Sequence, residues 1–174
     1  MNYEQSILKQ REEKDFVFKR HHHSPLTPEQ KKNFKKLNYF PVSEKYRFEL
    51  LIEKYEKKEL IEMQTSTGDI QIYTIFGVVH FIIDSFKVQL QVYTSEKNPD
   101  YYFVPFWDKT VQTNETYGAG RYLELDQKLN NKFVLDFNNA YNPYCAYNEH
   151  FSCPLVPPEN RLNVRIEAGE KKFG

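Results

Sequence analysis

The sequence predicts a mainly β fold, an antiparallel sandwich or barrel, preceded by one or two N-terminal α-helices. Apolar and polar residues alternate in several segments after residue 45, which is the pattern of half-buried strands. Turn residues join neighbouring segments and no helical crossover separates them, which argues against a parallel sheet. The length of 174 residues is that of one domain. We therefore expect residues 1–174 to form a single domain, with a helical part at 1–40 packed on a β domain at 41–174.

Both expected helices lie in the first 40 residues. Residues 2–19 are rich in Glu, Gln, Lys and Arg, which are good helix formers. The second helix has a clearer start, because Thr27 can act as the N-cap, Pro28 fits the first helical position and Gln30 can complete a capping box. This helix is expected to extend over residues 28–36.

Strands are expected where the apolar period is two. Five segments have this period: Tyr46 to Ile52, Ile70 to Ile72, Phe86 to Val92, Phe133 to Phe137, and Leu162 to Ile166. Turn residues at 66–69 and 83–86 predict antiparallel hairpins between adjacent segments. The charged run from Glu53 to Glu59 is interpreted as a solvated hairpin end.

Composition excludes several classes of protein. The 24 Lys and Arg residues balance the 24 Asp and Glu residues, so no overall field would attract nucleic acid, and we expect no nucleic-acid partner. A hydrophobic fraction of 40%, with 13 Tyr and 14 Phe, is that of a globular chain. Neither an apolar run that could span a membrane nor a secretory signal is present, so the expected location is cytoplasmic. The cofactor and the oligomeric state both stay open.

The first candidate binding segment is a glycine-rich turn. Two glycines flanking an alanine allow close backbone approach, and the arginine that follows could hold an anionic group. The residues that would bind a ligand here are Tyr117, Gly118, Gly120 and Arg121. The alternative is that the glycines only form a bend and that Arg121 pairs with a nearby carboxylate, which could be Asp108, Glu115 or Asp136.

The second candidate segment extends from residue 136 to residue 154 and is rich in Asn, Tyr, Pro and Cys. Its backbone is expected to be irregular but ordered, because side chains must satisfy its polar groups. Tyr141 and Tyr147 could line a pocket, and Asn138 and Asn142 could orient a small ligand. Equally, these side chains could simply hold the loop on the sheet.

The only two cysteines, Cys145 and Cys153, flank His150 in this segment. Three soft ligands could bind zinc if a fourth completed the site, but the spacing matches no familiar zinc motif. A disulfide and a catalytic thiol are further alternatives, and two buried inert thiols are the favoured interpretation. The three consecutive histidines at 21–23 are interpreted as a solvated linker.

Motifs spread over most of the chain resemble the domain of unknown function 1684 family. They include Asp108 with Thr110, Thr116 to Tyr122, Leu135 to Asn138, Ala140 to Pro143, Cys145 to Tyr147, Cys153-Pro154, Glu159-Asn160 and Ala168 to Lys171. Upstream, Pro25-Leu26, Leu37 to Pro41 and Tyr46-Arg47 also match, so the resemblance covers about residues 13–172. The resemblance implies no particular activity. Many relatives carry an export or lipoprotein signal, and this chain departs from them there.

Three functions follow as hypotheses. The leading one is a small-molecule binding domain whose pocket lies where the glycine-rich turn meets the second segment, with Arg121 holding an anionic group. One alternative is a hydrolase-like enzyme, with or without a metal, that uses Asp108 or Asp136 as a base. The other is a structural or interaction module whose polar loops only support the fold.

Overall fold

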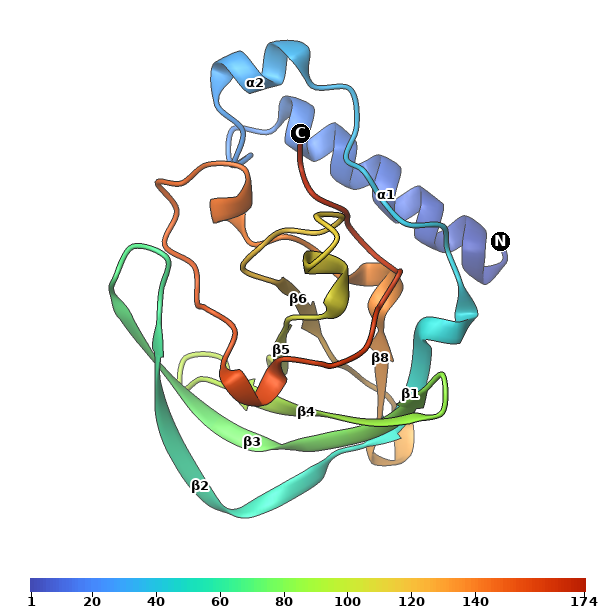
Figure 1. The fold of residues 1–174 in the computed structure, drawn as a ribbon, viewed down its shortest axis with the longest axis vertical. Coiled ribbons are helices and arrows are strands. Elements are labelled where there is room, and N and C mark those ends of the chain that lie inside the picture. Colours follow the sequence, from blue (N-terminus) through green and yellow to red (C-terminus); the bar gives the residue numbers. More distant parts are fainter.

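The computed structural model describes residues 1–174 and contains two antiparallel sheets with two helices beside them (Figure 1). Five strands form one sheet in the order β2-β3-β4-β5-β6, and three form the other in the order β1-β8-β7. The strands are β1 (Arg47–Leu51), β2 (Glu53–Gln64), β3 (Ile70–Ile83), β4 (Phe86–Thr94), β5 (Phe103–Phe106), β6 (Arg121–Glu124), β7 (Asp126–Gln127) and β8 (Lys132–Asp136). The predicted mainly β fold with N-terminal helices is confirmed.

The two helices are α1 (Tyr3–Arg20) and α2 (Pro28–Asn33). The predicted capping box of α2 is present, since the Gln30 amide donates to Thr27 Oγ1 at 3.2 Å and the Thr27 amide donates to Gln30 Oε1 at 2.8 Å. α2 ends three residues earlier than expected, because Phe34 adopts an extended conformation. The backbone then leaves the helix axis, and Phe34 becomes buried beneath α1 beside Phe18.

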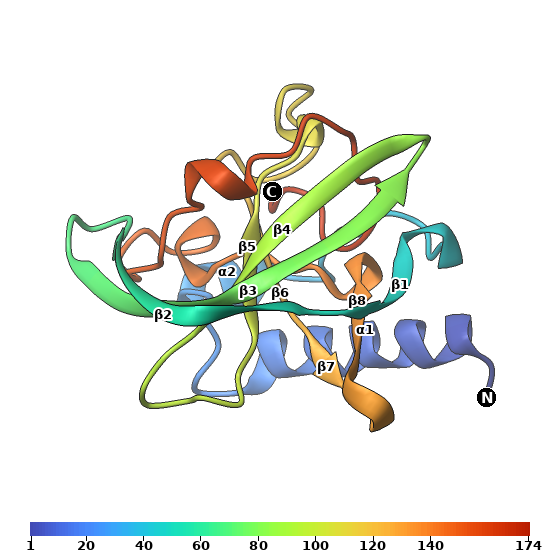
Figure 2. The ribbon, with the colours of Figure 1, turned by 90° about the horizontal axis from the view of Figure 1, so that it is seen from below.

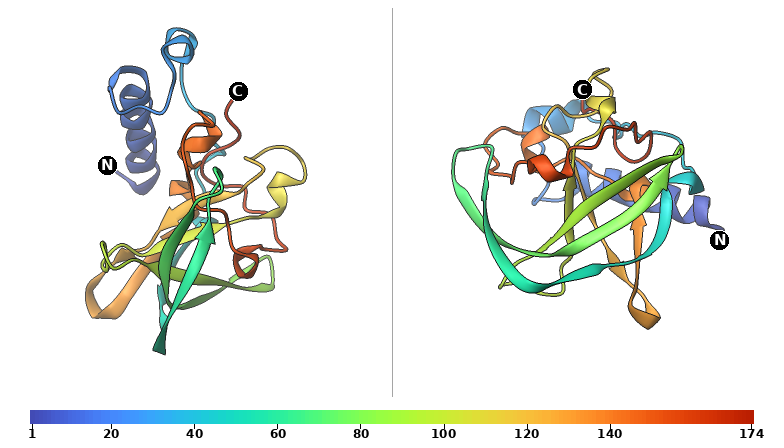
Figure 3. Two further views of the ribbon diagram at one scale, coloured as in Figure 1. Left: turned by 90° about the vertical axis from the view of Figure 1, so that its left-hand side faces the viewer. Right: turned by 60° about the horizontal axis from the view of Figure 1, so that its bottom comes forward.

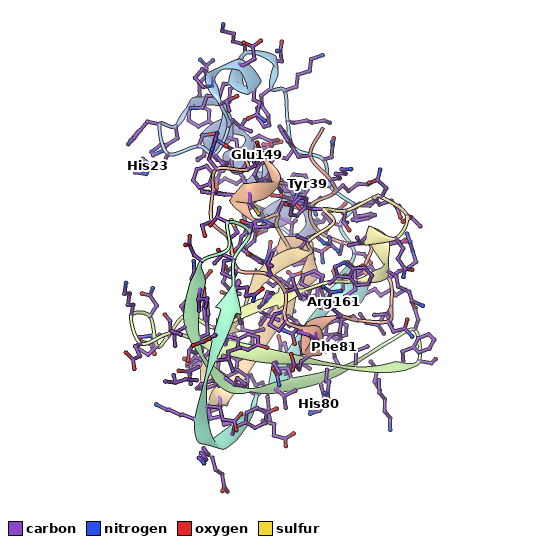
Figure 4. The ribbon with its side chains drawn as sticks, turned by 60° about the vertical axis from the view of Figure 1, so that its left-hand side comes forward. His23, Tyr39, His80, Phe81, Glu149 and Arg161 are labelled. Carbon is purple, nitrogen blue, oxygen red and sulfur yellow. The ribbon has the colours of Figure 1, made fainter.

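The expected hairpins join β2, β3 and β4. β3 pairs with β4 in antiparallel register up to Ile83 and Phe86. The two residues between them, Asp84 and Ser85, have φ values of 48° and 69°, the left-handed conformation that matches the twist of a tight hairpin. Along β3 the side chains alternate, so that Phe81 enters the core and His80 lies on the outer side of the strand (Figure 4).

The charged run from Glu53 to Glu59 is part of strand β2, not a hairpin end. β2 is an edge strand of the five-stranded sheet, and its pairing with β3 shifts register between Lys54 and Glu59. The ribbon bends sharply there (Figures 1 and 2). The run is exposed, as expected. Charged side chains at an edge strand discourage pairing with a second chain, which accounts for their place in the fold.

The predicted strand from Leu162 to Ile166 is absent, although its alternating apolar residues are buried as expected. No sheet strand pairs with the segment. Instead, Val164 accepts a backbone hydrogen bond from Lys109 at 2.9 Å, and the Ile166 amide donates to a side chain, Asp108 Oδ2, at 2.8 Å. Alternation of apolar and polar residues therefore indicates an extended segment with one buried face. It does not by itself show that the segment pairs with a strand.

The main core lies between the two sheets. Twenty buried residues form it, and Val79, Leu90, Leu135 and Ile166 are among those with no exposed side chain. α1 lies outside this core, on the side of the molecule away from the β2–β4 strands (Figures 1 and 3). No helix is both long enough and apolar enough to cross a lipid bilayer.

We predict that Gly120→Ala destabilises the protein whereas Gly118→Ala does not. Gly120 has φ of +98°, and an added Cβ would lie 2.5 Å from the carbonyl oxygen of Phe106. Backbone strain alone costs about 1–3 kcal/mol. At Gly118 an added Cβ has no neighbour within 4 Å, so this variant is the matched control, with a change within ~0.5 kcal/mol. Urea unfolding of both variants measures the difference, and equal stabilities would contradict the prediction.

Candidate functional site

Arg121 lies in the interior at the start of β6. Its side chain is 1% exposed, and both terminal nitrogens bind groups of the protein itself. Nη2 donates to Asp108 Oδ1 at 3.1 Å and to the Ile166 carbonyl at 2.9 Å, while Nη1 donates to the carbonyls of Ala168 and Glu170. Burial lowers the pKa of Arg121, and the charge of Asp108 opposes that shift. The two terminal nitrogens are thus engaged by Asp108 and the C-terminal segment, whereas Nε is buried without a hydrogen-bond partner.

Asp108 is as deeply buried as Arg121, and its carboxylate is also hydrogen-bonded within the protein. Its two carboxylate oxygens accept hydrogen bonds from Arg121, from the Thr110 hydroxyl and from the Ile166 amide. The Thr110 hydroxyl lies 2.8 Å from that of Thr116, which extends the network toward the glycine-rich turn. Of the carboxylates named as partners for Arg121 under the structural alternative, Asp108 is the one that pairs with it.

Asp136 and Asn138 lie at the end of β8, against the first turn of α1. Asp136 Oδ2 accepts from the Tyr3 hydroxyl at 2.7 Å, and Oδ1 accepts from the backbone and side-chain nitrogens of Asn138. The Asn138 side chain also binds both backbone polar groups of Ser43. Both candidates therefore fasten the N-terminal segment to the second sheet.

Asn142 and Tyr147 meet a buried glutamate, Glu170. Its carboxylate accepts hydrogen bonds from the Tyr147 hydroxyl, the backbone amide of Asn142 and Lys14 Nζ. Burial, followed by the charge of Glu170, raises the pKa of Tyr147 above its usual range. The cluster connects α1, the second candidate segment and the chain end. Glu170 was not among the side chains that we expected at a site, although it lies in the Ala168 to Lys171 motif named above.

Tyr141 instead lines an aromatic cleft of about 380 Å³ on another face of the molecule. Eight of its eleven lining residues are hydrophobic. The eleven residues come from β3, the loop before β5, β5, β6 and the second candidate segment: Tyr73, Tyr101, Phe103, Tyr122, Tyr141, Pro143, Tyr144, Phe151, Ser152, Cys153 and Pro154. The Phe103 ring lies parallel to those of Tyr73 and Tyr101, with centroids 5.6 and 6.2 Å away. We call this feature the aromatic cleft.

A carboxylate at the end of β6 accepts the hydroxyls of two cleft tyrosines. Tyr101 and Tyr141 both donate to Glu124 Oε1, and their hydroxyl oxygens lie 3.4 Å apart. Burial, followed by the negative charge of Glu124, raises the pKa of Tyr101 and of Tyr141 above the usual range. The two hydroxyls thus stay protonated as donors, and they fix the orientation of the carboxylate.

The two cysteines are free thiols, of which Cys153 lines the cleft and Cys145 lies beside it. The Cys145 amide donates to Cys153 Sγ at 3.3 Å, and the Tyr117 hydroxyl lies 3.6 Å from Cys145 Sγ. His150 is exposed, and no group of three His, Cys, Asp or Glu side chains is arranged to hold a metal ion. The expected ligand-binding residue Tyr117 therefore lies beside the two cysteines.

A second hollow, of about 1010 Å³, lies between α1 and the chain end. Basic and acidic side chains both line it, including Arg11, Asp15, Lys36 and Lys171. Arg11 lies over the Tyr39 ring, with its guanidinium carbon 4.3 Å from the centroid. Because both signs of charge are present, this groove selects no single class of ligand, and the aromatic cleft is the better defined site.

The cleft residues that sequence reasoning missed carry weak signals. Glu124 alternates with apolar neighbours in β6 as any outward strand residue does, and Tyr101 lies in a polar loop before β5. Tyr73 and Phe103 are strand aromatics with no distinguishing pattern. What unites them is the pairing of β3, β4, β5 and β6, which neighbouring residues along the chain do not reveal.

We predict that Arg121→Met lowers the free energy of unfolding by about 3–5 kcal/mol, because it leaves Asp108 as an unpaired buried charge. The matched control is Glu115→Gln, which removes a partly exposed partner of Arg165. Exposed pairs contribute about 0–1 kcal/mol. Chemical denaturation of both variants tests this, and an Arg121→Met protein as stable as the control would be inconsistent with the buried network.

Comparisons with known proteins place the chain in a family. No curated protein matches the sequence. A solution NMR structure of an uncharacterised protein from the gene locus rrnAC0354 of Haloarcula marismortui is similar to this structure with a TM-score of 0.72 and 35% sequence identity, over 97% of this chain and 94% of that one. The family described as "Protein of unknown function (DUF1684)" matches residues 32–171. The resemblance seen in the motifs is therefore confirmed, and the chain belongs to the DUF1684 family.

Proposed function

We propose that this protein binds a small planar molecule in the aromatic cleft. The observation that carries the proposal is the combination of aromatic walls with one oriented carboxylate: Glu124 does not itself line the cleft, but it accepts the hydroxyls of the lining tyrosines Tyr101 and Tyr141. Ligand sites are typically apolar clefts of roughly 300–1,000 Å³ with a few placed polar groups. The cleft has both properties.

The chemistry of the lining narrows the ligand class. Glu124 Oε1 accepts both tyrosine hydroxyls, and no hydrogen bond from the protein reaches Oε2. A ligand with an N–H or O–H donor on a flat ring could therefore place the ring against aromatic walls and its donor on Oε2. No lysine or arginine lines the cleft, so a neutral or cationic ring is favoured over an anionic one.

This class differs from the anionic ligand expected at Arg121. That expectation needs the guanidinium to face a ligand, whereas Arg121 is hydrogen-bonded on both terminal nitrogens in the interior. Of the residues expected from the sequence to bind a small ligand, Tyr141 lines the aromatic cleft. The hydrolytic alternative rests on Asp108 and Asp136, and the carboxylates of both accept hydrogen bonds from other groups of the protein.

We predict that benzamidine, a flat aromatic cation, binds the aromatic cleft with a dissociation constant in the ~mM range expected for a fragment. Benzoate has the same ring with a negative charge, and we expect it to bind at least about tenfold more weakly, since Glu124 would repel it. Titrations followed by two-dimensional NMR measure both constants and map the shifted amides.

Glu124→Gln is the test variant and Glu49→Gln, on the exposed face of β1, is the matched control. Glutamine keeps an oxygen for the tyrosine hydroxyls but removes the charge, so benzamidine affinity should fall about tenfold in Glu124→Gln alone. Shifts that map outside the cleft, or equal affinities for benzamidine and benzoate, would refute the proposed ligand class.

A further inference from the structure

Cys145 and Cys153 are neighbouring thiols on two differently anchored pieces of backbone. Cys145 lies in the short helical turn Tyr144–Ala146. Cys153 is held by the turn between β2 and β3, because its amide donates to Ser66 Oγ at 3.1 Å and its carbonyl accepts from the Ser66 amide at 2.9 Å. The Cys145 amide in turn donates to Cys153 Sγ at 3.3 Å. The second sulfur is therefore fixed directly beside the first cysteine.

The two thiols are not equivalent. Cys145 is partly exposed and Cys153 is buried. The hydrogen bond from the Cys153 thiol lowers the pKa of Cys145 to about 6, with further donation from the hydroxyls of Tyr117 and Ser66, while burial opposes the shift. The same hydrogen bond, together with burial, raises the pKa of Cys153. Cys145 is thus the more exposed residue of the two and the one whose sulfur is stabilised as a thiolate, the nucleophilic form.

We propose that Cys145 is a peroxide-reactive thiol and that Cys153 is its resolving partner, so that a hydroperoxide converts the pair into a disulfide. This inference does not depend on the proposed ligand, since it needs only the two sulfurs and a hydroperoxide. It assigns a modification site in the wall of the aromatic cleft, which Cys153 lines.

The chemistry has two steps. The Cys145 thiolate attacks the terminal oxygen of the hydroperoxide, a sulfur–oxygen bond forms, the oxygen–oxygen bond breaks, and the alkoxide that leaves takes up a proton as the alcohol. Cys153 then loses its proton and attacks the sulfenic sulfur, a disulfide forms, and hydroxide leaves with that proton as water. Two thiols are oxidised by two electrons, and one hydroperoxide is reduced.

The test is hydrogen peroxide treatment of the full chain followed by denaturation, alkylation with N-ethylmaleimide and intact mass measurement. We expect the wild type to lose two hydrogens and to take up no maleimide after treatment, and to take up two maleimides when untreated or reduced with dithiothreitol. Two alkylated thiols after peroxide treatment would overturn the proposal. A disulfide between two chains would overturn it as well.

Two matched variants separate the roles. Cys153→Ser keeps a hydrogen-bond donor beside Cys145, so Cys145 should form a sulfenic acid that dimedone captures. Cys145→Ser leaves the buried thiol alone, and we expect its oxidation to be at least about tenfold slower. Equal rates in the two variants would refute the assignment. Circular dichroism before treatment shows that each variant is folded.

Tyr117→Phe tests the positioning role of the tyrosine hydroxyl. The titratable groups that face Cys145 are Tyr117, Tyr122 and Cys153, of which Tyr117 and Cys153 donate to its sulfur. Removing the Tyr117 donor should therefore move the midpoint of Cys145 alkylation to higher pH in the Cys153→Ser background. A merely structural tyrosine would change the melting temperature and leave this midpoint in place. An unchanged midpoint would exclude Tyr117 from the reactive site.

Discussion

The buried ion pair between Arg121 and Asp108 is the interaction on which the arrangement of the chain end depends. The C-terminal segment joins neither sheet: the amides of Lys109 and Phe40 reach its carbonyls at residues 164 and 169, and its other carbonyls need donors from elsewhere. Arg121 supplies them to three carbonyls in alternate positions, at residues 166, 168 and 170. Asp108 keeps the arginine charged in the interior and also takes the Ile166 amide. One arginine therefore supplies the donors that the segment's isolated backbone bridges do not provide.

Several other features follow from that arrangement. The segment is held across the core, so Ile166 and Ala168 close it and Glu170 comes to lie beneath α1. Glu170 then connects Lys14, Tyr147 and Asn142, which joins the helix to the loop after β8. Burying a charged pair costs desolvation energy, and the hydrogen bonds to the carbonyls offset that cost.

Much of the fold could be predicted from the sequence because local rules determine it. Capping residues located α2, the period of two located β1, β3, β4 and β8, and the residues Asp84 and Ser85 located a tight turn. The error at Leu162 to Ile166 has a physical cause, since alternation reports burial of one face and says nothing of backbone partners. The charged residues of β2 were misread because an exposed edge strand has no apolar alternation to reveal it.

The site was less predictable than the fold, again because a local sequence pattern does not reveal which distant residues become partners. The glycine-rich turn and the polar loop are both unusual, yet the structure puts Arg121, Asn138 and Asn142 into separate buried networks and leaves Tyr141 and the cysteines at the cleft. Polar residues that support a loop and polar residues that bind a ligand are of the same types, so the composition of a segment does not separate the two roles. Only strand pairing brings Tyr101, Glu124 and Tyr141 together.

The dependence of the C-terminal segment on Arg121 can be measured directly by native-state hydrogen exchange at the Ile166 amide. This amide donates to Asp108 Oδ2 at 2.8 Å outside any strand or helix. If the buried pair makes the segment part of the core, its exchange should require global unfolding, as for the amides of β3 and β4. Exchange at the rate of a surface loop would show that the segment opens by itself and would contradict the central role of Arg121.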